Sequence, residues 1–154
     1  EGNPVQNMIY AAEGAQLYID DSELCGGDYY SIMLFGNNSL ASIRDSLIHD
    51  CTIAFCLRDQ GQLTLEKSVV RDIESCFHVY SAYVRVTLQH NRIIGDLFED
   101  MDRLTNHTFV CHGNYFDPPV DPRAQGSYHC DDCDEVHVES TISHLSDDLI
   151  DEPN

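Results

Sequence analysis

An internal repeat of about 23 residues is the feature that most limits how this chain can fold. Five eight-residue segments align without gaps, and their starts at positions 17, 41, 63, 86 and 109 are 24, 22, 23 and 23 residues apart. A unit this short cannot bury an apolar face alone, so successive units must stack to form a continuous core. At 154 residues, the chain has the length of one such domain.

Within the repeat, apolar and polar residues recur at fixed positions. The first apolar column contains Leu17, Ala41, Leu63, Val86 and Phe109. The second, two residues later, contains Ile19, Ile43, Leu65, Leu88 and Cys111. The third is polar and contains Ser22, Ser46, Ser68, Asn91 and Asn114. The fourth contains Leu24, Ile48, Val70, Ile93 and Phe116. Because side chains two apart share a face of a strand, these columns predict an inward-facing strand, a polar bend and a return to the core.

A second alternating pair precedes the aligned segments. The pairs are Ile9/Ala11, Met33/Phe35, Phe55/Leu57 and Phe77/Val79. They predict a further strand in each repeat. Gly14 and Asn38 fall at the same place between this strand and the next, where a left-handed backbone would make a tight corner.

These features predict an all-β fold, a right-handed single-stranded parallel β-helix of about five rungs with 22–24 residues each. The Ser and Asn column would form a ladder of hydrogen-bonding side chains along one corner. The alternative is a leucine-rich repeat, whose L-x-L-x-x-N-x-L pattern matches the same columns. The β-forming residues of 50–57 and 75–80 argue against it. We expect the solenoid to cover residues 1–117, followed by an acidic capping segment and tail at 118–154.

The repeats, most clearly residues 63–70 and 86–93, resemble those of the pectate-lyase-like superfamily of parallel β-helix proteins. The resemblance covers about residues 9–116. It implies a carbohydrate-related role, since that superfamily includes polysaccharide lyases, glycoside hydrolases, epimerases, phage tailspikes and non-catalytic surface proteins. The enzymes of the superfamily carry more rungs, and long loops build their substrate cleft. This chain differs from them, because its connections between strands are short.

The charge balance excludes some classes of function. Lys and Arg number 8 against 27 Asp and Glu, which gives a formal net charge of −19. Such a surface repels phosphates, so no nucleic-acid partner is expected. The apolar runs are too short for membrane insertion. Two N-x-S/T sequons, at Asn37 and Asn106, suit a secretory chain, and we expect a secreted or cell-surface location.

The outward positions of the first aligned strand form the first candidate site. The expected ligand-binding residues are Tyr18, Ser42, Thr64, Gln89 and His112. Beside them run the candidate catalytic residues Asp20, Arg44 and Glu66, where an arginine lies between two carboxylates. In a polysaccharide-active enzyme these groups would supply acid, base or charge stabilisation. The alternative is a solvated face with a ladder of ion pairs between rungs.

The second candidate site lies in the C-terminal segment. A C-x-x-C motif with flanking histidines can bind zinc through thiolates and imidazoles. The candidate ligands are His129, Cys130, Cys133 and His137. Calcium is the alternative, through the oxygen ligands Asp131, Asp132, Asp134 and Glu135. A disulfide or two free thiols would explain the cysteine pair equally well, and the seven cysteines of the chain are an odd number.

The few rungs and short connections favour a non-catalytic module that binds carbohydrate or has a structural role at a surface. The alternative is a small polysaccharide-active enzyme, a lyase or glycoside hydrolase, that uses Asp20, Arg44 and Glu66. The expected partner is a polysaccharide. Because a solenoid has open ends, a homo-oligomer through the rod ends or sides is a further expectation.

Overall fold

The computed structural model describes residues 7–26, 29–79, 84–98, 108–118 and 128–131, and all its regular elements are parallel β-strands. They form three sheets, which we call sheets I, II and III. Sheet I contains β1 (Asn7–Ala12), β4 (Tyr30–Phe35), β7 (Ile53–Arg58), β10 (Ser75–Val79) and β13 (Asp96–Phe98). Sheet II contains β2 (Gln16–Asp20), β5 (Leu40–Arg44), β8 (Gln62–Glu66), β11 (Arg85–Gln89), β14 (Thr108–His112) and β16 (Tyr128–Asp131). Sheet III contains β3 (Glu23–Cys25), β6 (Leu47–His49), β9 (Val69–Arg71), β12 (Arg92–Ile94) and β15 (Tyr115–Asp117).

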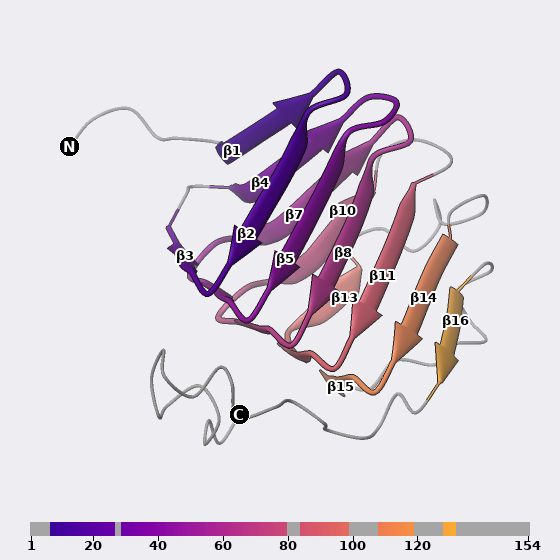
Figure 1. Cartoon of the computed structure of the whole chain (residues 1–154). Coiled ribbons are helices and arrows are strands. Elements are labelled where there is room, and N and C mark those ends of the chain that lie inside the picture. The colour runs from indigo at the N-terminus through magenta and orange to yellow at the C-terminus, as the bar shows by residue number, and fades with distance from the viewer. Residues whose placement is uncertain (1–6, 27–28, 80–83, 99–107, 119–127, 132–154) are drawn as a thin grey trace.

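Each turn of the chain contributes one strand to each sheet, and equivalent strands lie side by side along the rod (Figure 1). The predicted parallel β-solenoid is confirmed, with turns of about 23 residues each. The turns number roughly four, where the sequence predicts about five. A leucine-rich repeat would place a helix or 3₁₀ segment where this chain has further strands. No helix occurs in the described residues, and therefore none there could span a membrane.

The predicted columns are confirmed by the strand register. In sheet II the pairing runs from Leu17 through Ala41, Leu63 and Val86 to Phe109. The same four pairings align the second column from Ile19 to Cys111. β16, which lies in the segment expected to cap the rod, pairs with β14 and extends sheet II by one strand.

The predicted alternating pair Met33/Phe35 is out of register with the other pairs by one residue. Ile32 pairs with Ile9 and Phe55, and Leu34 pairs with Ala11 and Leu57, so Ile32 and Leu34 belong to the inward columns. Both are fully buried. β4 is apolar on both faces, and a strand without alternation does not show from its sequence which face is inward.

The predicted polar ladder forms at the corner between sheets II and III. The Ser22 amide donates to Ser46 Oγ at 3.1 Å, and the Ser46 amide donates to Ser68 Oγ at 3.1 Å. The Ser68 and Asn91 amides continue the ladder by donating to the next asparagine Oδ1, each at 2.9 Å. The preceding column takes positive φ, and contains Asp21, Asp45, Lys67, His90 and Gly113. The left-handed residue of this corner therefore lies one position before the predicted bend.

Aromatic rings fill the core from β7, in the middle of sheet I, towards its last strand. Phe55 and Phe77 stack with centroids 5.4 Å apart, and Phe77 meets Phe109 edge to face at 5.4 Å. Phe98 joins them, 4.8 Å from Phe109. No disulfide joins Cys51, Cys56 and Cys76, which lie in neighbouring turns.

Candidate functional site

The outer face of sheet II carries the first predicted site. One outward column contains Tyr18, Ser42, Thr64, Thr87 and Val110, in register across five strands. The next contains Asp20, Arg44, Glu66, Gln89 and His112. The inward columns of the same strands are held by the core, and this fixes the outward residues as straight rows perpendicular to the strands.

Arg44 is the charged centre of this face. Its Nη2 lies 3.1 Å from Asp20 Oδ2, and its Nε lies 3.7 Å from Asp45 Oδ2. The hydrogen bond and charge of Asp20, together with the charges of Asp45 and Glu66, raise the pKa of the Arg44 guanidinium above its ordinary value. The side chains of Arg44 and Asp20 are both 56% exposed. An ion pair this open to water contributes little stability, and its groups remain accessible to a ligand.

A shallow depression surrounds this ion pair. It has a volume of about 340 Å³ and is lined by Tyr18, Ile19, Asp20, Ser42, Arg44 and Glu66. Tyr18 is 68% exposed, and its hydroxyl donates to Gln16 Oε1 at 3.2 Å. The depression therefore offers an exposed aromatic ring beside a guanidinium and two carboxylates.

The structure brings together only part of the predicted ligand-binding set. Tyr18 and Ser42 line the depression with all three candidate catalytic residues. Thr64 pairs with Ser42 in the same outward row. Gln89 and His112 lie further along the rod, on β11 and β14. The His112 ring packs against His90, with centroids 5.3 Å apart, and so belongs to a different part of the surface.

The predicted zinc and calcium ligands in the C-terminal segment fall mainly outside the described residues. Those outside are Asp132, Cys133, Asp134, Glu135 and His137. His129, Cys130 and Asp131 belong to β16, where the backbone pairs them with Val110, Cys111 and His112. Both metal hypotheses for this segment stay predictions.

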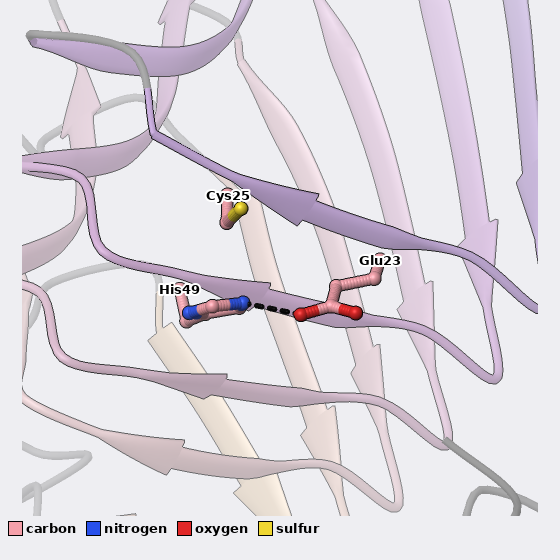
Figure 2. A group of neighbouring side chains, drawn as sticks. All are labelled: Glu23, Cys25 and His49. Carbon is pink, nitrogen blue, oxygen red and sulfur yellow. Dashed lines mark hydrogen bonds and ion pairs between the residues drawn. The ribbon is translucent and has the colours of Figure 1, made fainter. Parts of the chain in front are cut away.

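A different group of ligand-type side chains, absent from the sequence-based prediction, lies on sheet III (Figure 2). Glu23 and Cys25 on β3 and His49 on β6 have ligand atoms within 4.8 Å of one another. The aligned columns contained the necessary signal. Leu24 and Ile48 share an inward column, so Cys25 and His49, each one residue later, are adjacent in register.

The comparisons with known proteins assign the chain to no family. No family model matches it, and neither the curated proteins nor the solved structures contain a match. The strand pairing of this chain is therefore the sole basis for assigning the solenoid fold. The resemblance to the pectate-lyase-like superfamily stays a prediction.

Proposed function

We propose that this protein is a non-catalytic module that binds a polysaccharide on the outer face of sheet II. The observation that supports it is the depression in which the exposed ring of Tyr18 lies beside Arg44, Asp20 and Glu66. Such a ligand would be met outside the cell or at its surface, which is the expected location.

The chemistry of the depression suits a sugar ring. An aromatic side chain offers a large, rigid apolar surface at a low cost in conformational entropy, and the C–H face of a pyranose packs on such a surface. The guanidinium of Arg44 presents several N–H donors, while the carboxylates of Asp20 and Glu66 accept from hydroxyl groups. Rows of side chains at the regular spacing of the strands match a ligand with repeating polar groups.

The charge of the molecule narrows the class of polysaccharide. A net charge of −19 repels polyanions, and the depression itself contains two carboxylates against one guanidinium. A neutral polysaccharide therefore suits this face better than a polyuronate. Binding through hydroxyl groups would also be less sensitive to salt than binding through phosphates or uronates.

The exposure of the charged groups favours binding over catalysis. Glycosidases tune their acid by placing it in an apolar or closely paired environment. Asp20 and Arg44 instead pair with each other in contact with solvent. The enzyme alternative, a lyase or hydrolase using Asp20, Arg44 and Glu66, is an outcome of the test below.

The test is a screen of the full chain against neutral and acidic polysaccharides, followed by titration of the best ligand with variants. Replacing Tyr18 with alanine should weaken binding by about tenfold, which corresponds to about 1.4 kcal/mol for the lost stacking. The matched control is Tyr10→Ala on sheet I, since Tyr10 is also exposed, at 57%. We expect this control to bind normally.

Three results would contradict the proposal. They are the absence of binding to every neutral polysaccharide, a preference for polyuronates, and equal losses in the two tyrosine variants. New reducing ends or unsaturated products during the assay would establish the enzyme alternative instead. Their loss in Arg44→Ala and Glu66→Gln would assign it to this depression.

A further inference from the structure

We infer that Glu23, Cys25 and His49 form a binding site for a divalent transition-metal ion of the Zn²⁺ class. The site lies on sheet III and is separate from the proposed polysaccharide face. Glu23 and Cys25 share the outward face of β3, one residue before and one residue after the inward-facing Leu24. On β6, His49 pairs with Cys25. Figure 2 shows the three side chains together against these two strands.

The set of donors fits this class of ion. Zinc takes thiolate sulfur, imidazole nitrogen and carboxylate oxygen in tetrahedral sites, and these three residues provide one of each. Calcium and magnesium prefer sites built only of oxygen, so a site with sulfur and nitrogen discriminates against them. The carboxylate and thiolate together would neutralise the charge of the ion.

The geometry permits coordination with small movements. The three ligand atoms lie within 4.8 Å of one another. Around a tetrahedral zinc ion with bonds of about 2.0–2.3 Å, donors are roughly 3.5 Å apart. Glu23 and Cys25 are exposed and free to adjust, whereas the His49 side chain is only 13% exposed and is held in place. Three protein ligands leave one tetrahedral position, which faces solvent.

The surroundings of His49 provide an independent observation that points to a metal. Its Nε2 lies 2.7 Å from Glu23 Oε2, and its Nδ1 is hydrogen-bonded to the Asp50 carboxylate. Histidines that bind metals usually donate their second ring N–H to a carboxylate, which orients the ring and increases its basicity. Asp50 has this positioning role here, and the metal would replace the proton between Nε2 and Glu23.

The opposite side of the imidazole is a poorer site. His49, Asp50 and Asp72 also lie close together there. Arg71, however, is paired with Asp72 and places a positive charge at that group. A cation would have to displace this guanidinium. The Nε2 side instead carries the Cys25 thiol, a ligand type that suits Zn²⁺ better than a second carboxylate.

The test is titration of the full chain with Zn²⁺ and Co²⁺, with Cys130 and Cys133 replaced by serine to remove the C-terminal motif from the measurement. We expect one equivalent of metal per chain. Bound Co²⁺ should show thiolate-to-metal charge transfer and the strong visible bands of tetrahedral coordination. Zn²⁺ should also raise the midpoint of thermal unfolding, because it links β3 to β6.

Variants of the exposed ligands, which should still fold, complete the test. Cys25→Ser should abolish the charge-transfer band, and both it and Glu23→Gln should weaken Zn²⁺ binding by more than about 100-fold, whereas Asp50→Asn should weaken it by about 10–100-fold. The control Glu74→Gln, at an exposed carboxylate elsewhere, should have no effect. The inference is overturned if the serine background binds no metal, or if Cys25→Ser leaves the affinity unchanged. It is also overturned if binding depends on Asp72 instead of Cys25.

Discussion

At the scale of single residues, the polar ladder shows how a solenoid satisfies buried backbone groups at a corner. Asn91 is fully buried, and its side chain makes three hydrogen bonds. Its Oδ1 accepts from the Ser68 amide at 2.9 Å, and its Nδ2 donates to the Leu65 carbonyl at 2.8 Å. The serines of the first turns make only part of this pattern, so the asparagines hold the corner more firmly.

We expect Asn91→Ala to lower the free energy of unfolding by about 2–4 kcal/mol, because it removes the acceptor of the buried Ser68 amide and the side-chain bond to the Leu65 carbonyl. Asn91→Ser should restore part of the loss, since a serine at this position can still accept from the Ser68 amide. Urea unfolding measures the effect, with Gln89→Ala on the outer face as the control. A loss in Asn91→Ala no larger than that of the control would show that the ladder does not stabilise the corner.

The buried thiols give a second prediction at this scale. Burial, followed by the charge of Asp50, raises the pKa of Cys51 to about 11. Burial also raises the pKa of Cys76 well above its ordinary value, with Cys51 and Cys111 adding to it. Since alkylation needs the thiolate, both residues should react slowly in the folded protein even at pH 9.

Mass spectrometry after timed treatment with iodoacetamide measures this protection. The exposed Cys25 should be labelled before the buried Cys51 and Cys76, and urea should make these two react at ordinary rates. Because the pKa of these thiols is higher in the folded protein than in the unfolded chain, the folding stability depends on pH. The stability contributed by the neutral thiols is present below pH 9 and is lost as the pH rises towards the folded-state pKa. Rapid labelling of Cys76 in the folded protein would contradict the described core.

At the scale of strands, the residues of the inward columns contribute most of the free energy of folding, because they form the buried core. Sheet I is apolar on both faces over part of its length. Ile32 belongs to the main core, whereas Met33 packs outside it, against a second cluster of Tyr30, Ile53 and Cys56. Two apolar faces stabilise this sheet, but they also remove the alternation that would show its register.

The register of β4 is tested by comparing Ile32→Ala with Met33→Ala. The first should lower the free energy of unfolding by about 2–5 kcal/mol, since it leaves a cavity in a close-packed core. The second should lower it by about 1 kcal/mol, because Met33 is only partly buried. The reverse order, measured by denaturant unfolding, would restore the pair Met33/Phe35 that the sequence predicts.

At the scale of the whole molecule, one rod presents different chemistry on different sheets. Sheet II offers an exposed aromatic and charged face, while sheet III carries the cluster around His49. The end of the rod at the first turn is less covered, because Leu17, Ile19 and Leu24 are only partly buried. The homo-oligomer expected through the rod ends or sides stays a prediction, for which light scattering over a range of concentrations is the measurement.

The repeat predicts most of this architecture because its spacing nearly fixes the register. A row such as Leu17, Ala41 and Leu63 follows from the interval alone. Contacts between the side chains of neighbouring strands do not follow from spacing, since they depend on rotamers and on the twist between strands. For this reason, the hydrogen bonds of His49 to Glu23 and Asp50 become apparent only in the structure. The adjacency of Cys25 and His49, in contrast, follows from the aligned columns.

The most direct test of the proposed function is a map of the bound ligand on the protein. Backbone amide NMR shifts, recorded as a short neutral oligosaccharide is added, locate the contact surface without any substitution. We predict that the largest changes fall on β2, β5 and β8, around Tyr18, Ser42 and Arg44. Changes confined to sheet I or sheet III, or no changes at a large excess of oligosaccharide over protein, would contradict the account.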